Sequence, residues 1–539
     1  MCPDPLTARD LAELAAARIA PEEASRQLAQ LADPPPPVHL ARPATVGDGI
    51  HRLAPAEHER LLAAARAAAA AGRFAKFVPA SGAASRMFRS LAAFLERGDE
   101  ARAGVLAARA ALGDEVAREV VAFVDALPRL ALAVDLASLL GRTPDELAAA
   151  ARREPLRRLV AAVLEADGLG ALALPKALVP FHAVALPGGG EATRTAFEEQ
   201  LVEGAAWLAD RARRVRIHFT VPPGTTALFA ARLAAARAPL ESELGVRFAV
   251  GFSEQDPATD TLALDGAGRP FRRADGALLR RPAGHGALLG DLERMGGDIV
   301  FVKNIDNVLP AARHAEIARW KLLLAGRLLE LERAVHGWQR ARAAGELGDD
   351  EVEHALDFFA RSFGSEAAAA AIGAGATRDA RRALLADLVD RPLRVAGVVP
   401  ARGEPGGGPF WVLDERGRAS LQIVESSQID ATSPDQVARF RAATHFNPVD
   451  LVLSLADAWG RPYPLGRFVD PRAAFVARRS EGGRELVALE RPGLWNGAMA
   501  GWSTHFVEVP GSTFAPVKTV LDLARPEHAR ALPPAHAPR

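Results

Sequence analysis

An alternation of strand and helix patterns in the middle of the chain places the strongest constraint on the fold. Residues 214–221, 246–252 and 298–302 are short runs rich in β-branched and aromatic residues, which is typical of strands. Residues 194–211 and 225–236 have the amphipathic spacing of helices. Strands that alternate with helices form an open, mostly parallel sheet with helices on both faces. We therefore predict an α/β protein built on such a sheet.

Composition divides the chain into an N-terminal extension, a core and a C-terminal part. Residues 1–70 are alanine-rich with helical spacing and are interrupted by a proline run, which indicates a helical extension with a linker. We predict the α/β core at 71–400, with large helical insertions at 89–170 and 311–390. Residues 401–539 mix short strands and loops, and we predict a C-terminal, β-rich α+β part there.

A run of three glycines, 406–408, separates two strand patterns at 395–399 and 410–413. Tight hairpin turns require positive backbone φ angles, which glycine adopts at no steric cost. We therefore predict that these two strands pair as a hairpin.

The charge balance and the single cysteine exclude several classes of function. In 539 residues, 66 lysines and arginines balance 66 acidic residues, so no overall basic field attracts nucleic acid or an acidic membrane. Cys2 is the only cysteine, which excludes an intramolecular disulfide and a cysteine metal cage. The N-terminus lacks a secretory pattern, and the most apolar stretch, 126–140, is interrupted by proline and charged residues. We predict a cytoplasmic protein that binds neither nucleic acid nor membranes.

Only five of the 66 basic residues are lysines, and three of them lie in segments suited to phosphate binding. A lysine retained in an arginine-rich chain indicates a place that requires a compact ammonium group instead of a planar guanidinium. We assign Lys176, Lys303 and Lys518 to such places. We interpret Lys76 and Lys321 as chance survivors of a bias toward arginine, and that bias is the alternative explanation for all five.

A loop of small residues follows the strand pattern at 74–79. Its sequence is Ser81-Gly82-Ala83-Ala84-Ser85-Arg86, and a helix is expected after it. Small side chains let backbone N–H groups approach a phosphate, and the start of a helix adds a favourable dipole. Ser85 offers a hydroxyl and Arg86 a guanidinium fork to phosphate oxygens. The loop is neither a Walker loop nor a dinucleotide fingerprint, so an ordinary strand-to-helix turn is the alternative.

His285 lies between Gly284 and Gly286, just before another helix pattern. Glycine permits close backbone approach to a base or ribose, and histidine can hydrogen-bond a hydroxyl or a phosphate at neutral pH. The segment is therefore a candidate for nucleoside binding, and a turn with an exposed histidine is the alternative.

Asn304, Asp306 and Asn307 follow the strand pattern at 298–302. Ligands of open parallel sheets bind at the carboxyl ends of the strands, and a carboxylate there suits Mg²⁺ held together with substrate phosphates. Capping of the next helix is the alternative, above all for Asn307.

Seven motifs in this chain resemble, in the same order, those of the uridine-diphosphate-sugar pyrophosphorylases. The resemblance covers residues 74 to 525, and the motifs are Ser81-Gly82-Ala83-Ala84-Ser85-Arg86, Pro175-Lys176, Gln255-Asp256-Pro257, Pro282-Ala283-Gly284-His285-Gly286, Asn304-Ile305-Asp306-Asn307, Val424-Glu425-Ser426 and Phe514-Ala515-Pro516-Val517-Lys518. The resemblance implies a nucleotidyltransferase sheet of the glycosyltransferase-A type. The whole chain also resembles an uncharacterised bacterial family, the domain of unknown function numbered 4301, which brings no established activity.

The resemblance implies a role for each matching residue. Arg86, Lys176 and Lys518 would be catalytic residues that act on phosphates, and Asp306 would hold Mg²⁺. Glu425 would accept a sugar hydroxyl, and we add Asn307 and Asn447 as sugar-binding candidates; a structural loop is the alternative for Asn447. The implied nucleotide-binding residues are Ser81, Gly82, Ala83, Ser85, Gln255, Gly284, His285 and Gly286.

The implied activity is that of a Mg²⁺-dependent nucleotidyltransferase, which joins a nucleoside triphosphate, with UTP favoured, to a sugar 1-phosphate. The chain departs from the family at Ala80, where the family has a paired glycine, and at Ala287, where some members have an acid. These departures leave the nucleotide preference open, and they also leave open the alternative of a nucleotide-sugar-binding or regulatory protein that keeps the fold with weakened or lost catalysis. A transferase for a phosphorylated non-sugar acceptor is a third hypothesis.

Overall fold

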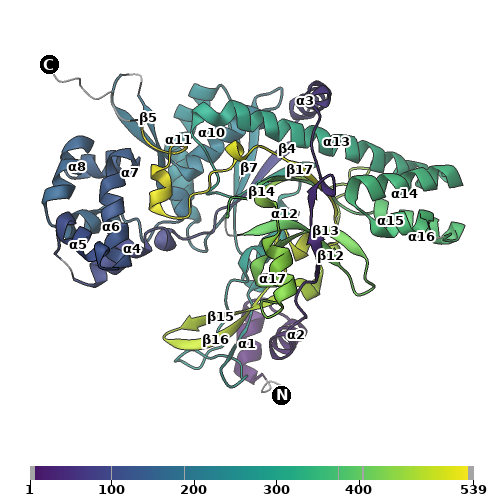
Figure 1. Ribbon diagram of the computed structural model, residues 1–539, viewed down its shortest axis with the longest axis horizontal. Coiled ribbons are helices and arrows are strands. Elements are labelled where there is room, and N and C mark those ends of the chain that lie inside the picture. Colours follow the sequence, from purple (N-terminus) through teal and green to yellow (C-terminus); the bar gives the residue numbers. More distant parts are fainter. Residues whose placement is uncertain (1–5, 99, 187, 374, 404–405, 532–539) are drawn as a thin grey trace. The chain divides into compact units, whose positions relative to one another are not determined.

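The largest sheet of the protein is mixed and has nine strands (Figure 1). The computed structural model describes residues 6–98, 100–186, 188–373, 375–403 and 406–531, so Cys2 lies outside the described residues. Strands β2 and β3, β3 and β17, β17 and β11, and β10 and β4 are parallel, while β14 is antiparallel to β11 and β10. The prediction of an α/β protein with a mostly parallel sheet is confirmed. The strands lie in the order β2 (Thr45–Val46), β3 (Gly49–His51), β17 (Ser503–Glu508), β11 (Leu393–Pro400), β14 (His445–Ser454), β10 (Ile299–Lys303), β4 (Phe74–Pro79), β7 (Arg214–Val221) and β8 (Arg247–Glu254).

The described chain separates into two compact units, each assembled from three stretches that are distant in sequence. Unit 1 contains residues 6–77, Ser253–Lys303 and Arg319–Gly511. Unit 2 contains Val78–Phe252, Asn304–Ala318 and 512–531. The domain limits that we predicted near residues 70 and 400 stay a prediction.

Three smaller sheets accompany the nine strands. In unit 1, β1 (Leu40–Pro43), β12 (Gly407–Leu413) and β13 (Ala419–Glu425) form one, and β15 (Phe475–Glu481), β16 (Arg484–Glu490) and β9 (Ala263–Asp265) form another. In unit 2, β5 (Pro180–Ala185) pairs with β6 (Glu191–Thr195).

The hairpin predicted around the glycine run is wrong. Strand β11 lies between β14 and β17 in the large sheet, whereas β12 pairs with β1 and β13. Gly407 and Gly408 belong to β12 itself and face Glu425 and Val424. A Cβ atom on Gly407 would lie 2.9 Å from the Ile423 side chain. This glycine therefore serves close strand packing instead of a turn.

The strands β4 and β10 confirm the patterns that we assigned to buried strands. They are parallel, and Ile299 lies opposite Phe74. All five residues of β10 are buried, which explains its continuous apolar run because a strand covered on both faces has no polar side. Asn304, Asp306 and Asn307 follow directly in the chain.

Helices fill the stretch of unit 2 where we predicted an insertion at 89–170, and Figure 1 shows α4 to α8 grouped together. Helix α10 begins with a capping box in which Thr195 and Glu198 bind each other's backbone N–H groups. The helices of this unit are α4 (Arg89–Glu96), α5 (Ala103–Ala111), α6 (Glu115–Ala126), α7 (Leu132–Leu139), α8 (Pro144–Arg153), α9 (Arg157–Leu164), α10 (Ala196–Leu208) and α11 (Thr226–Leu244).

The predicted helical stretch at 311–390 is also confirmed. It contains α13 (His314–Ala344), along which the chain passes from unit 2 to unit 1, and then α14 (Asp349–Phe363), α15 (Glu366–Gly373) and α16 (Arg378–Val389). Among the described residues, no helix combines the length and the apolar character that crossing a membrane requires. The other helices of unit 1 are α1 (Ala8–Ala16), α2 (Pro21–Ala32), α3 (Pro55–Ala70), α12 (Leu289–Met295) and α17 (Pro434–Arg441).

Candidate functional site

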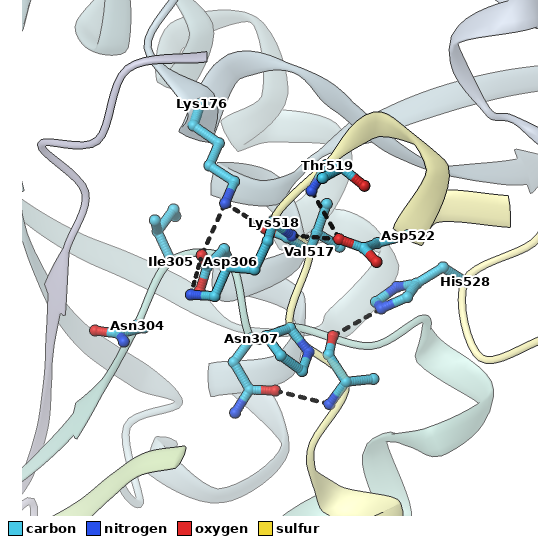
Figure 2. A network of polar contacts seen from close by, with 12 residues as sticks. Lys176, Asn304, Ile305, Asp306, Asn307, Val517, Lys518, Thr519, Asp522 and His528 are labelled. Atoms are coloured by element: carbon cyan, nitrogen blue, oxygen red, sulfur yellow. Dashed lines mark hydrogen bonds and ion pairs between the residues drawn. The ribbon is translucent and has the colours of Figure 1, made fainter. Parts of the chain in front are cut away.

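Two lysines and one aspartate from three distant segments meet in unit 2 (Figure 2). The ammonium nitrogen of Lys176 lies 2.8 Å from Asp306 Oδ2, and that of Lys518 lies 2.9 Å from the same oxygen. Lys176 starts a short 3-10 turn before β5, Asp306 follows β10, and Lys518 precedes a 3-10 turn at Val520–Ala524. Two ammonium groups and one carboxylate leave a net charge of +1. We call these three residues the lysine–aspartate cluster.

Burial and charge set the ionisation of the cluster. Lys176 and Asp306 are each 8 % exposed, whereas the Lys518 side chain is 55 % exposed. Burial raises the pKa of Asp306, but the two ammonium groups outweigh it and the pKa of this carboxyl is lowered. Ionised Asp306 therefore stabilises the folded state at pH values above the pKa of an aspartate in the unfolded chain. This contribution to the free energy of unfolding is lost as the pH falls through the lowered pKa of Asp306. Burial lowers the pKa of Lys176 against the opposing effect of Asp306.

Backbone hydrogen bonds hold the segment of Lys518 against the segment of Asp306. The Lys176 ammonium donates to the carbonyl of Val517, and the Val517 N–H donates to the Asp306 carbonyl at 3.0 Å. The Ala515 N–H donates to Asn307 Oδ1 at 3.2 Å (Figure 2). Asn307 therefore ties two loops together and does not cap a helix, because the next helical turn begins only at Ala311.

The small-residue loop is attached to both lysine segments. The Lys176 N–H donates to the Gly82 carbonyl at 2.9 Å, and Ala83 and Pro175 form an isolated antiparallel bridge. Beyond the loop, the Val520 N–H donates to the Met87 carbonyl at 3.2 Å. The structure thus brings the loop next to Lys176 and Lys518. In the sequence, helices α4 to α9 lie between the loop and Lys176, and Lys518 follows much later. Within the loop, Ser81, Ala83, Ser85 and Arg86 are exposed.

Gly82 leaves open space in this loop. A Cβ atom built on it would meet no atom within 4 Å, and its φ angle lies outside the left-handed region. The fold itself therefore does not require glycine at this position. A requirement for glycine here would have to come from a ligand that approaches the backbone.

The cluster fits Mg²⁺ only together with a phosphate ligand. Within the described part of the chain, no group of three or more His, Cys, Asp or Glu side chains is arranged to hold a metal ion. Mg²⁺ is commonly bound through one or two carboxylates plus substrate phosphates and water. The single carboxylate of Asp306 meets this requirement, while a site made of protein ligands alone is not present among these residues.

Two residues with predicted roles in unit 1, His285 and Glu425, form a second group together with Trp495. The His285 ring stacks on Trp495 with centroids 3.9 Å apart and an angle of 11° between planes. The Leu494 N–H donates to His285 Nδ1, and Trp495 Nε1–H donates to Glu425 Oε1 at 3.1 Å. Burial lowers the pKa of His285, and Glu425 opposes this effect. The predicted nucleoside residue His285 and the predicted sugar residue Glu425 thus share Trp495 as a neighbour.

The glycines beside His285 are required by the fold of unit 1. Gly284 has a φ of 72°, and a Cβ atom on Gly286 would lie 2.2 Å from the Pro492 carbonyl oxygen. Both positions therefore exclude other residues without reference to a ligand. The role of these glycines in nucleotide binding stays a prediction.

Two other predicted residues of unit 1 differ in their contacts. Asn447 Nδ2 donates to the Gly397 carbonyl at 3.1 Å, and its Oδ1 accepts from the Val449 N–H at 3.0 Å. These bonds support the backbone near Val449, whose φ is 57°, and they favour the structural alternative for Asn447. Gln255 has a buried Nε2 without a hydrogen-bond partner among the described residues. Its role in reading the base stays a prediction.

The sequence did not reveal several residues that surround these sites. Trp495 stacks on His285 and donates to Glu425. Gln200, on α10, donates to the carbonyls of Asn304 and Ile305 at 2.9 and 3.3 Å and so supports the loop of Asp306. No local pattern marks these residues, because their partners lie far away in the chain.

Comparisons with known proteins give a family match and distant structural likenesses. The profile of a family described as "Domain of unknown function (DUF4301)" matches residues 7–529. The UDP-N-acetylglucosamine pyrophosphorylase of Trypanosoma brucei is 13% identical, with 90% of this chain and 72% of that chain covered and a TM-score of 0.42. The UDP-glucose pyrophosphorylase of Leishmania major is also 13% identical, with 96% and 79% covered and a TM-score of 0.43. No curated protein is similar to this chain in sequence. Likenesses this distant do not establish an activity.

Proposed function

The chain belongs to the DUF4301 family, and we propose that it is a Mg²⁺-dependent nucleotidyltransferase. It would join a nucleoside triphosphate, with UTP favoured, to a sugar 1-phosphate and release pyrophosphate. The observation that supports this proposal most is the lysine–aspartate cluster beside the loop at 81–86. A buried ammonium, a half-exposed ammonium and a carboxylate next to open backbone offer what a polyphosphate and its metal ion require.

The reaction needs no nucleophile or general base from the protein. An ionised oxygen of the sugar phosphate attacks the α-phosphorus in line, a new P–O bond forms, and the bond to the β-phosphate oxygen breaks. Alignment and neutralisation of charge are the remaining requirements. Arg86 and Lys176 would bind the triphosphate, and Lys518, the more exposed lysine of the cluster, would bind the sugar phosphate.

Asp306 would hold Mg²⁺ together with the substrate phosphates. When bound, the ion supplies positive charge that neutralises the developing pyrophosphate. Asp306 also holds the ammonium groups of Lys176 and Lys518 close together, which requires no bound ion.

The group in unit 1 would bind the nucleoside and the sugar. Gln255 would read the base with its side-chain amide, and His285, held between Gly284 and Gly286, would bind the nucleoside. Glu425 would accept a sugar hydroxyl. The remaining sugar-binding candidates, Asn307 and Asn447, use their amide oxygens in backbone hydrogen bonds, and the Asn447 amide nitrogen does the same.

A second candidate function is nucleotide-sugar binding or regulation without turnover. Asp306 Oδ2 is already in contact with two ammonium groups, so binding of Mg²⁺ has to compete with them. If both lysines remain bound to Asp306 Oδ2 and exclude Mg²⁺, the protein would bind phosphate but would not catalyse the transfer.

Pyrophosphate release from a substrate panel tests the proposal. The purified protein is mixed with Mg²⁺, each of four nucleoside triphosphates and a set of sugar 1-phosphates, and thermal shifts are measured for the same ligands. We expect release of pyrophosphate with at least one pair and the largest thermal shift with UTP. Ligand-induced stabilisation without release would support the binding protein instead. Neither release nor stabilisation would overturn both candidates.

Gly82→Ala is expected to weaken binding of the triphosphate by about tenfold, because the added methyl fills space that a phosphate would use. Its stability should stay within about 0.5 kcal/mol of the wild type, since the methyl meets no protein atom. Titration of UTP by calorimetry measures the first effect. Gly104→Ala in α5, which also adds a methyl in open space, is the matched control and should leave binding unchanged.

A further inference from the structure

Unit 2 contains a cavity of about 330 Å³ that the proposed reaction does not use. None of its described lining residues has a role in that reaction. Its walls are mostly apolar and include the side chains of Leu132 on α7, Val163 on α9, and Leu169 and Leu178. The volume lies at the lower end of the range for small-molecule sites, which combine an apolar lining with a few polar groups. We call it the α7 cavity.

One carboxylate in the wall of the α7 cavity has an oxygen without a partner. Asp135, in the first turn of α7, is partly buried, and its Oδ2 accepts from the Thr193 hydroxyl at 2.8 Å. Its Oδ1 accepts no hydrogen bond from a described residue, and no cationic side chain among these residues forms an ion pair with Asp135. Burial, the largest effect, raises the pKa of Asp135 although Thr193 and the charge of Arg232 oppose it. The carboxylate is therefore poorly compensated by the protein itself.

The charges beside the cavity leave a negative excess. Arg232 also lines the cavity, but its Nη2 donates to Glu198 Oε2 at 2.7 Å, so the charge of this guanidinium is matched. Asp135 remains as an unmatched negative charge, and the charge of Glu198 acts on it in the same direction as burial. The polar side of the cavity therefore favours a cation.

The geometry favours an ammonium group over a guanidinium. Asp135 offers one free oxygen, because Thr193 binds the other. A guanidinium fork is best matched by both oxygens of a carboxylate, whereas an ammonium is a compact charge that can donate to a single oxygen. The remaining lining is apolar, and it requires an apolar body on the same molecule.

The α7 cavity shares its walls with the segments of the candidate phosphate site. Leu174 lines it, and the carbonyl of this residue accepts from the Ala84 N–H of the small-residue loop at 3.2 Å. Phe88, just after that loop, and Leu178, in the turn that Lys176 starts, line it as well. A molecule in the cavity would contact residues on both sides of Lys176, and it would suppress local opening of this segment.

We propose that the α7 cavity binds a small organic ammonium ion with an apolar body at Asp135, and that its occupation stabilises the segment of Lys176. The effect on phosphate binding rests on the proposed function, whereas binding of the ammonium ion does not.

Binding of hexylammonium tests the ligand class. Calorimetric titration and thermal shifts compare this ion with 1-hexanol and hexanoate, which have an apolar chain of similar length and a neutral or negative head. We expect hexylammonium to raise the melting temperature and to bind at least about tenfold more tightly than either of the other two. No binding of hexylammonium, or equal binding of 1-hexanol, would overturn the proposal.

Two variants locate the binding in the α7 cavity. Asp135→Asn keeps the shape and can still accept from Thr193, so it should fold with undiminished stability and bind hexylammonium about tenfold more weakly. Leu169→Trp fills the cavity without changing its charge and should also weaken binding. Asp125→Asn removes an exposed carboxylate of α6 outside the cavity and is the matched control. Wild-type affinity in both cavity variants would show that the ion binds elsewhere.

Hydrogen exchange of the peptide 174–180 tests the coupling to Lys176 without any phosphate. Hexylammonium should slow exchange of this peptide by about fivefold in the wild type and leave Asp135→Asn unchanged. Equal exchange with and without the ion in the wild type would contradict the coupling.

Binding of inorganic pyrophosphate separates this inference from the proposed function. We expect hexylammonium to increase the affinity of the wild type for pyrophosphate by about fivefold, and to have no effect in Asp135→Asn. An unchanged affinity in the wild type would refute the effect on phosphate binding. If the wild type binds no pyrophosphate at all, the proposed function fails, while the titrations and the exchange experiment still decide whether the cavity binds the ammonium ion.

Discussion

Asp306→Ala is expected to lower pyrophosphate release by roughly 10³-fold, because it removes the candidate metal ligand and the counter-ion of two lysines at once. Without the carboxylate, the Lys176 and Lys518 ammonium groups repel each other, and Lys176 is too buried to gain compensation from water. Both groups then lose the alignment that the transfer requires. Steady-state assays of pyrophosphate release with the best substrate pair of the panel measure this loss.

A matched control and an isosteric variant separate charge from folding. Asp145→Ala changes an exposed aspartate in the first turn of α8 and should leave release unchanged. Asp306→Asn keeps the shape of the side chain and removes only the charge, so it should lose nearly as much activity as Asp306→Ala. Release above a tenth of the wild-type rate in a folded Asp306→Asn would contradict a role for this charge.

Local sequence patterns predicted the helices and strands in which burial follows one regular pattern along the whole element. Strands β4 and β10 could be recognised because both are buried in the sheet and therefore consist mostly of apolar residues, with Lys76 and Lys303 as the exceptions. The helical stretches at 89–170 and 311–390 were recognised for the same type of reason, since the helical period repeats over many turns. The glycine run at 406–408 led to a wrong prediction of a hairpin. Gly407 is required because its strand packs closely against Ile423 of β13, and residues adjacent in sequence give no sign of this contact.

The candidate site was only partly accessible to sequence reasoning. The order of motifs indicated Lys176, Asp306 and Lys518, and the structure places all three in contact. The contacts of His182 with Glu199 and His528 could not be anticipated, because the three residues come from β5, α10 and the last described stretch of the chain. A buried pair whose members are far apart in sequence leaves no period and no composition signal.

The sequence also gave no sign that lysines are buried, and the burial of Lys321 shows that this residue is not a chance survivor. We regarded this lysine as a chance survivor, but it is 2 % exposed and forms an ion pair with Asp450, itself 4 % exposed. Lys303, which we assigned to a phosphate segment, ends β10 opposite Asp450 and is 1 % exposed. A compact ammonium thus suits the interior of unit 1 as well as a phosphate site.

Lys321→Met is expected to reduce the free energy of unfolding by about 3–5 kcal/mol, because it leaves the Asp450 carboxylate buried without its ion-pair partner. Urea unfolding followed by tryptophan fluorescence measures the loss as a lower midpoint. Replacing both partners, as in Lys321→Met with Asp450→Leu, should recover most of the stability, since an apolar pair needs no compensation for its charge. Arg382→Met, which breaks an exposed pair with Asp349, is the control and should change stability by less than about 1 kcal/mol. An unchanged midpoint in Lys321→Met would contradict this prediction. It would mean that another group compensates the charge of Asp450, and Lys303, which lies opposite Asp450 in the pair of β10 and β14, is the candidate.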